Sequence, residues 1–193
     1  GFETRDHTDR TPLLPARNTG PPLRKAGRRD SRRGWELHSF GMKPGPFTLH
    51  RATSVAHAVG LLERFADADE EAKVIAGGQS LTALMNLRLA RPDHLIDVTG
   101  VPELHRIVDD ANGVRIGAMV TQAEALADHA VTLEVPLLSA ALRHIGHTHI
   151  RNRGTVGGSI AHADPAAELP VVALAVDTEL GVGGRGGRRT IAA

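Results

Sequence analysis

The chain contains no cysteine and no tyrosine, and aromatic residues make up only 3% of its 193 residues. The lack of cysteine excludes disulfide bonds, thiolate zinc sites and iron–sulfur clusters ligated by thiolates of this chain. No apolar run reaches the roughly 18–20 residues that span a bilayer, and the N-terminus lacks the apolar segment of a secretory signal. The sequence therefore predicts a cytoplasmic protein without a membrane span, whose core consists of Leu, Val, Ile and Ala.

Charge is unevenly distributed along the chain. Residues 1–41 hold nine basic and five acidic residues, whereas residues 42–193 hold fourteen and seventeen. A nucleic-acid-binding protein needs a basic face on its folded part, so no nucleic-acid partner is expected. Residues 1–41 also lack apolar periodicity and are rich in Arg, Pro and Gly, which predicts a disordered segment outside the fold.

Residues 42–100 have the pattern of a small α/β lobe. Short strands are expected at 47–50, 73–76 and 94–98, and helices at 55–65 and 81–89, the first of them capped by Ser54. The alternation of strands and helices predicts parallel pairing of the strands.

Residues 101–193 have a different pattern and are expected to form a second lobe. Segments 105–109 and 113–117 flank a turn and predict a hairpin. Helices are expected at 121–129, with a Thr121–Glu124 capping box, at 135–144, and at 165–176, with Pro165 in the first turn. A second hairpin, 178–182 with 189–191, surrounds the glycine-rich stretch 183–187. That stretch is interpreted as a plain turn, because no helix follows it as in a phosphate loop.

The stretch Ala76-Gly77-Gly78-Gln79-Ser80-Leu81, called here the first glycine motif, links an expected strand to an expected helix. Glycine lets a ligand approach the backbone closely, and free N–H groups at a helix start attract an anion. The Ser80 hydroxyl adds a donor. Taken alone, the motif is explained equally well as a purely structural turn.

A second glycine motif, Thr155-Val156-Gly157-Gly158-Ser159, repeats the two glycines next to hydroxyl residues. Two such motifs suit a diphosphate better than a single phosphate. Neither has the lysine of G-x-x-x-x-G-K-[ST], and neither matches G-x-G-x-x-G. A nucleoside triphosphate hydrolase and a Rossmann dehydrogenase are therefore disfavoured.

Four stretches, Met42–Phe47, Ala76–Leu81, Ile150–Ser159 and His162–Glu168, together resemble the FAD-binding medium subunit of molybdenum hydroxylases. This family is typified by the carbon monoxide dehydrogenase medium subunit and the flavin domain of xanthine dehydrogenase. The resemblance implies that both glycine motifs hold the FAD pyrophosphate, and that Ile145 lies beside the cofactor. It thus implies these cofactor-binding residues: Ala76, Gly77, Gly78, Gln79, Ser80, Leu81, Thr155, Val156, Gly157, Gly158, Ser159, Asp164 and Glu168. For the two acidic residues, charge compensation at a helix N-terminus is the alternative.

The resemblance also implies a two-lobed α+β fold, with a small parallel α/β lobe (42–100) and a larger antiparallel-sheet lobe (101–193). The family continues into a third, C-terminal domain. Ala193 lies near the expected junction with that domain, so we expect the C-terminal domain to be absent from this chain. The implied function is electron transfer through FAD to an external acceptor. The implied partners are a molybdopterin-containing large subunit and an iron–sulfur small subunit. No catalytic acid or base is expected in this chain. A non-catalytic assembly fragment and a stand-alone FAD-dependent oxidoreductase remain the alternatives.

Two further groups of residues have competing explanations. His144, His147, His149 and His162 lie close in sequence, but their spacing matches no familiar metal motif, and no metal site is expected. Arg151 is suited either to neutralising phosphate charge or to a structural ion pair.

Overall fold

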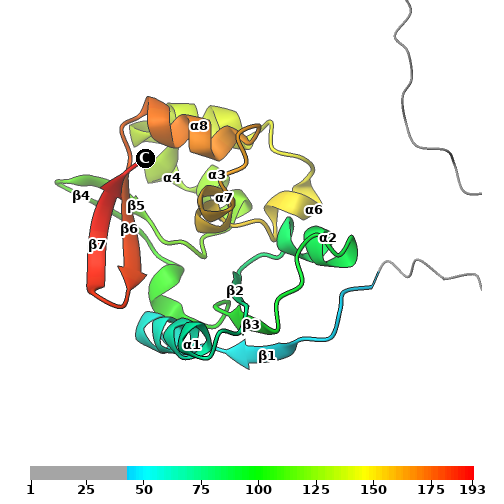
Figure 1. Cartoon of the computed structure of the whole chain (residues 1–193). Coiled ribbons are helices and arrows are strands. Elements are labelled where there is room, and N and C mark those ends of the chain that lie inside the picture. The colour runs from blue at the N-terminus through cyan, green and yellow to red at the C-terminus, as the bar shows by residue number, and fades with distance from the viewer. Residues whose placement is uncertain (1–42) are drawn as a thin grey trace, which may run out of the picture. The chain divides into compact units, whose positions relative to one another are not determined.

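The computed structural model describes residues 43–193, and the disorder predicted for residues 1–41 lies outside them. The described part is α+β, as predicted (Figure 1). Strands β1 (Thr48–Arg51), β3 (His94–Asp97) and β2 (Ala72–Ile75) form a sheet in the order β1-β3-β2. Both pairings are parallel, which confirms the strand–helix–strand prediction.

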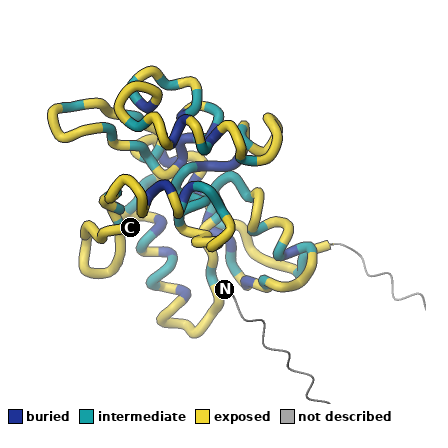
Figure 2. The backbone as a smooth tube through the Cα atoms, turned by 90° about the horizontal axis from the view of Figure 1, so that it is seen from above, coloured by how far each residue is buried: buried dark blue, intermediate teal, exposed yellow. Residues whose placement is uncertain are grey.

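Helix α1 (Val55–Asp67) covers this sheet and begins where the sequence predicts. The Ser54 side chain accepts a hydrogen bond from the His57 N–H at 3.0 Å, which is the expected N-cap. Ala58, Leu61 and Phe65 lie on the buried face of α1 and pack with Ile96 of β3 in one core cluster. Buried residues alternate with exposed ones along the chain in Figure 2, as amphipathic elements require.

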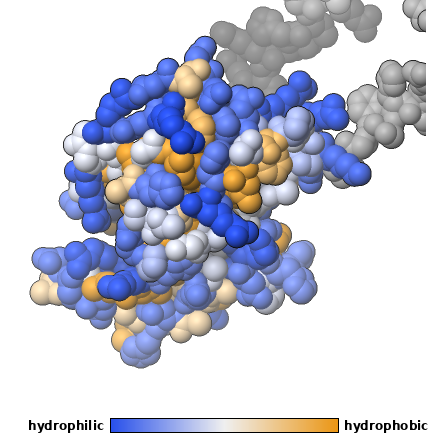
Figure 3. Space-filling model, turned by 90° about the horizontal axis from the view of Figure 1, so that it is seen from below, coloured by the Kyte–Doolittle hydropathy of each residue, from blue (hydrophilic) through white to orange (hydrophobic). Residues whose placement is uncertain are grey.

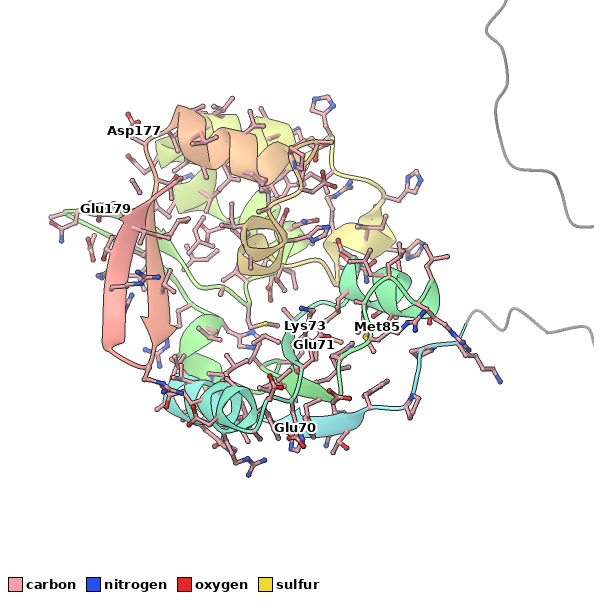
Figure 4. All side chains as sticks on the ribbon, in the orientation of Figure 1. Glu70, Glu71, Lys73, Met85, Asp177 and Glu179 are labelled. Carbon is pink, nitrogen blue, oxygen red and sulfur yellow. The ribbon has the colours of Figure 1, made fainter. Side chains whose placement is uncertain are left out.

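Helix α2 (Leu81–Asn86) is shorter than the predicted segment 81–89. It ends at Asn86 with Leu87 as its C-cap. The next residue, Arg88, has a positive φ of 58°, which a helix cannot continue. Met85 is the buried residue of this helix (Figure 4). In the same view Glu71 and Lys73 lie close together at β2, joined by an ion pair of 3.1 Å.

The remaining elements are six helices, a short 3₁₀ turn and two hairpins within residues 101–193. They are η1 (Pro102–Leu104), β4 (Ile107–Asp110), β5 (Gly113–Ile116), α3 (Gln122–Ala127), α4 (His129–Glu134), α5 (Pro136–Leu142), α6 (Thr148–Arg151), α7 (Val156–His162), α8 (Glu168–Ala175), β6 (Glu179–Gly184) and β7 (Gly187–Ala192). Both hairpins were predicted. Their strands form two separate antiparallel pairs in the described residues.

The capping box at α3 is confirmed, but the helix predicted over 121–129 is interrupted. The Glu124 N–H donates to the Thr121 hydroxyl at 3.1 Å, and the Thr121 N–H donates to the Glu124 carboxylate at 2.8 Å. Asp128 then takes an extended conformation, and its side chain accepts from the Val131 N–H at 3.0 Å. Asp128 therefore ends one helix and caps the next.

The helix predicted over 165–176 starts three residues later, at Glu168. Asp164 folds the preceding segment into a turn, because its side chain accepts from the Ala166 N–H at 2.9 Å. Pro165 therefore lies in this turn, so its predicted place in the first helical turn is wrong. The helix predicted over 135–144 is also shorter in the structure, where α5 begins at Pro136 and ends at Leu142.

The hairpin of β6 and β7 confirms a turn within the glycine-rich stretch 183–187, but the turn is shorter than predicted and consists of Arg185 and Gly186 alone. Gly184 pairs with Gly187, whose φ of 93° suits glycine. Gly183 lies against Val55 and Val59 of α1, which places the hairpin beside that helix (Figure 1).

A second core cluster is formed by residues between positions 120 and 172, most of them on helices. It contains Val120, Ala125, Val131, Leu138, Leu142, Leu169 and Val172. The face seen in Figure 3 shows apolar patches separated by hydrophilic residues. Within the described residues, no helix is long and apolar enough to cross a membrane.

Candidate functional site: a cavity at the first glycine motif

The first glycine motif occupies the turn between β2 and α2, as the sequence predicts. The N–H groups of Gly77, Gly78, Gln79 and Ser80 have no hydrogen-bond acceptor among residues 43–193. Gly78 has a φ of 72°, a conformation that L-residues rarely adopt. The motif therefore presents four consecutive backbone donors that the fold itself leaves unused.

A cavity of about 420 Å³ adjoins these donors. Its lining comes from the end of β2, the first glycine motif, one face of α2, and Arg153. Gln79, Thr82 and Asn86 supply neutral polar side chains, and Arg153 supplies the only charged one. A cavity with backbone donors, one cation and no carboxylate in its lining suits an anionic ligand.

The second glycine motif forms the start of helix α7 and its N-cap. Thr155 is the N-cap of α7, and the two glycines lie in the first turn of that helix. All four following N–H groups are already bonded: Val156 to the Val120 carbonyl, Gly157 to Ala118, Gly158 to the Thr155 hydroxyl, and Ser159 to the Thr155 carbonyl. Within the second glycine motif, only the Thr155 N–H has no acceptor among residues 43–193.

Packing explains the glycines of the second motif. A Cβ on Gly157 would overlap the Ala118 side chain and lie 2.8 Å from the Ala118 carbonyl oxygen. A Cβ on Gly158 would lie 2.7 Å from the Thr155 hydroxyl that caps the helix. Both positions therefore need glycine because other atoms of the same chain pack closely against them, whatever ligand is bound.

The two motifs touch each other. A Cβ on Gly77 would overlap the Arg153 carbonyl oxygen and lie 2.7 Å from its carbonyl carbon. On the other side, Gly158 lies against Ala76, whose Cβ is 3.7 Å from where a Gly158 Cβ would stand. The structure thus brings together two glycine motifs that are about 75 residues apart in sequence.

The buried residue Gln122 contacts the segment that directly precedes the second glycine motif. Gln122 is 5% exposed, its N–H donates to the Gly154 carbonyl at 2.8 Å, and its side-chain oxygen has no partner among the described residues. A Cβ on Gly154 would lie 3.0 Å from that oxygen. Sequence reasoning missed Gln122, because a polar residue at a helix start ordinarily faces solvent.

The hydroxyl groups of the two motifs also differ. The Thr155 side chain is 3% exposed and accepts from the Gly158 N–H at 3.0 Å. Ser80 is exposed, and its side chain makes no capping bond to α2. Thr155 therefore serves the fold, whereas the Ser80 hydroxyl is available to a ligand.

The two predicted acidic residues do not line the cavity. Asp164 bonds to the backbone of its own turn. Glu168 is half-buried in the first turn of α8, where a carboxylate is favourable whatever its other role. Ser80 and Leu81 also lie outside the cavity lining, as do residues 155–159.

Arg151 and Arg153 have different surroundings. The Arg151 guanidinium donates to the carbonyls of Ile145 and Gly146, at 2.9 and 3.1 Å, and so fixes the turn after α5. Of the two explanations considered for Arg151, this geometry supports a structural role, although with carbonyls and not an ion pair. The exposed Arg153 makes no ion pair with residues 43–193, and it lines the cavity. The sequence offered one signal for a role of Arg153 at the site, its position directly before Gly154 and the second glycine motif.

The histidines do not gather into a metal site. No group of three or more His, Asp or Glu side chains within residues 43–193 is placed to hold a metal ion. His147 caps α6 without a side-chain hydrogen bond, and His162 ends α7.

Comparison with known proteins gives consistent results. Residues 45–193 match the family described as FAD binding domain in molybdopterin dehydrogenase. The 6-hydroxypseudooxynicotine dehydrogenase complex subunit alpha of Paenarthrobacter nicotinovorans is 48% identical over 136 residues, covering 70% of this chain and 45% of the relative. The carbon monoxide dehydrogenase medium chain of Hydrogenophaga pseudoflava is 40% identical over 152 residues, covering 79% of this chain and 52% of the relative.

A solved structure agrees. Quinoline 2-oxidoreductase from Pseudomonas putida 86 superposes with a TM-score of 0.74 at 36% identity, covering 78% of this chain and 51% of that one. The chain thus spans about half the length of the curated relatives that it matches.

Proposed function

This chain belongs to the family of FAD-binding domains in molybdopterin dehydrogenases, its cofactor is FAD, and we propose that it holds the FAD diphosphate on the first glycine motif. The observation that carries the proposal is the row of four unused backbone donors at Gly77–Ser80, beside a cavity without a carboxylate. Gly77 and Gly78 keep this surface free of side chains. These features fit an anionic diphosphate, so the residues present suit the cofactor of the family.

The second glycine motif has a supporting role in this proposal. Its packed glycines hold α7 and the Arg153 carbonyl against the first motif. The Thr155 N–H and the Ser159 hydroxyl, which makes no hydrogen bond with residues 43–193, are the groups that it offers to the cofactor. Asp164 and Glu168 remain proposed cofactor contacts on the strength of the family motif alone.

We further propose that the chain serves as the FAD-bearing electron-transfer part of a molybdenum hydroxylase. FAD, when bound, supplies redox chemistry, and the residues of this chain bind it and orient it. Because the chain has no cysteine, thiolate-bound iron–sulfur clusters would lie on a small subunit, and the molybdopterin on a large one. Electrons would leave FAD for an external acceptor. The relatives named above as a complex subunit and a medium chain support this role.

The exposed apolar surface of helix α8 supports assembly with partner subunits. Helix α8 has apolar residues around its whole circumference, and Val171 and Leu174 are 56% and 61% exposed. Exposed large apolar side chains of this kind mark contact surfaces. The division into lobes 42–100 and 101–193 belongs to the same proposal. The two core clusters divide later in the chain, near position 120, because Val101 and Met119 pack with the first cluster.

The proposal is tested by retention of FAD. The full chain is incubated with FAD, desalted, and examined by its visible absorption spectrum. The wild type is expected to keep flavin, and Gly78→Asp is expected to lose it, because a carboxylate would be placed among the diphosphate donors. Gly184→Asp is the matched control, since no atom lies within 4 Å of a Cβ there and the same charge is added away from the cavity.

Loss of flavin in both variants, or in neither, would argue against the first motif as the binding site. A wild type that retains no flavin, although its circular dichroism shows a folded chain, would favour the alternative of a non-catalytic assembly fragment. Rapid reduction of bound flavin by an organic substrate without any partner subunit would favour a stand-alone oxidoreductase.

A further inference from the structure

Arg153 has no assigned part in the function described so far, yet it lines the cavity of the first glycine motif. The other lining residues, which lie between Ile75 and Asn86, are neutral. Three of the residues with free N–H groups, Gly77, Gly78 and Gln79, therefore line the same space as this one cation, without a carboxylate in the lining.

Three observations separate Arg153 from an ordinary surface arginine. Its carbonyl is packed against Gly77, so its backbone position is fixed relative to the free donors. It makes no ion pair or hydrogen bond through its side chain with residues 43–193, whereas Arg151, two residues earlier, is bound to two carbonyls. Its position directly precedes Gly154, which the buried Gln122 holds in place.

We infer that the guanidinium of Arg153 pairs with the diphosphate of the cofactor and makes the site selective for diphosphate-containing ligands. The inference rests on the proposed function. Arginine matches the oxygens of a phosphate with two parallel donors, which adds geometric selectivity to charge. The chemical class recognised is thus a nucleoside diphosphate moiety, and ADP, which carries it without the flavin, competes with FAD.

The test measures dissociation constants of FAD and ADP for the full chain and for Arg153→Gln. The substitution is expected to weaken both ligands by a similar factor, about tenfold to a hundredfold, because both present the same diphosphate. Arg153→Lys is expected to recover part of the loss, since it keeps the charge but not the planar fork. The melting temperature without ligand is expected to stay unchanged.

Arg189→Gln is the matched control. It removes the same charge from an exposed position on β7, which lies on the opposite side from α2 in Figure 1. It is expected to leave both dissociation constants unchanged. Added salt is expected to weaken binding more in the wild type than in Arg153→Gln, because screening acts on the charge that the variant lacks.

Each other outcome overturns the inference. Equal FAD binding in the wild type and Arg153→Gln would remove the role of Arg153 and leave the proposed function standing. A loss for FAD without a loss for ADP, or FAD binding without ADP binding, would place the arginine against another part of the cofactor. A wild type that binds neither ligand would reject the proposed function and the inference together.

Discussion

The two glycine motifs have similar sequences but different surroundings. The first leaves four consecutive N–H groups, at Gly77–Ser80, without an acceptor in the described residues. The second uses the N–H groups of residues 156–159 within the fold, and its glycines are required by packing against Ala118 and Thr155. Two adjacent glycines with a serine close by therefore mark a ligand surface in one place and close packing within the protein in the other.

The difference shows why neither motif is sufficient alone. The first motif supplies donors, and the second supplies the surface against which the first is held. Their contact runs from Gly77 to the Arg153 backbone and from Gly158 to Ala76. A change at this contact is expected to affect both folding and binding, whereas a change elsewhere in either motif is expected to affect only one of them.

The largest effect is expected for Gly77→Ala, which breaks the contact between the motifs. The new Cβ would overlap the Arg153 carbonyl, a backbone atom that cannot rotate away. The free energy of unfolding is expected to fall by about 3 kcal/mol, and FAD retention is expected to be lost. Urea denaturation and the desalting assay measure the two effects.

Gly60→Ala is the control for this prediction, because a Cβ on Gly60 meets no atom within 4 Å on the exposed side of α1. It is expected to stabilise the chain by about 0.5–1 kcal/mol, as alanine is favoured over glycine in a helix. A Gly77→Ala variant as stable as the wild type would show that the two motifs are not in contact.

A pair of hydroxyl substitutions sharpens the comparison. Thr155→Val removes the buried cap of α7 and is expected to cost about 1 kcal/mol of unfolding free energy. Ser80→Ala removes an exposed hydroxyl without a capping bond, so stability should change by less than about 0.5 kcal/mol. FAD affinity is expected to fall about tenfold in Ser80→Ala, if its hydroxyl meets the diphosphate. Equal stability losses in the two variants would contradict the assigned roles.

The smallest effect is expected from pH, and it concerns the sheet that carries the first motif. Burial lowers the pKa of His50 below its usual 6.5, and nearby His94 and Arg64 lower it further. His50 and His94 share a hydrogen bond of 3.0 Å between β1 and β3, and His94 also contacts Glu70 at 3.1 Å.

Because the fold favours neutral His50, its contribution to stability is complete above about pH 6.5 and declines as the pH falls through the lowered pKa. Urea midpoints recorded from pH 7.5 to pH 5 are therefore expected to decrease, and less so in His50→Gln. A wild type that gains stability over this range would contradict the assigned direction.

The sequence predicted much of this structure because the decisive signals were local. Ser54, the Thr121–Glu124 capping box and the turn within 183–187 each act within a few residues, and each is confirmed. The turn at Asp164 and the second cap at Asp128 were missed, because Asp is equally suited to helix starts and to turns.

The site was predicted less completely than the fold. The sequence identified the first glycine motif, and the structure places Ala76, Gly77, Gly78 and Gln79 at the cavity. It did not reveal that the N–H groups of residues 156–159 are bonded internally, because their partners Ala118 and Val120 are distant in sequence. The positions of Arg153 and Gln122 depend on the same long-range contacts.

The most direct test of the central claim is amide hydrogen exchange of the full chain with and without FAD. Without FAD, residues 77–80 are expected to exchange rapidly, since they have no acceptor within the described residues, and residues 156–159 slowly. With FAD, protection is expected to rise at 77–80 and to change little at 156–159. Protection gained at 156–159 alone, or at neither motif while flavin stays bound, would contradict the assignment of the diphosphate to the first glycine motif.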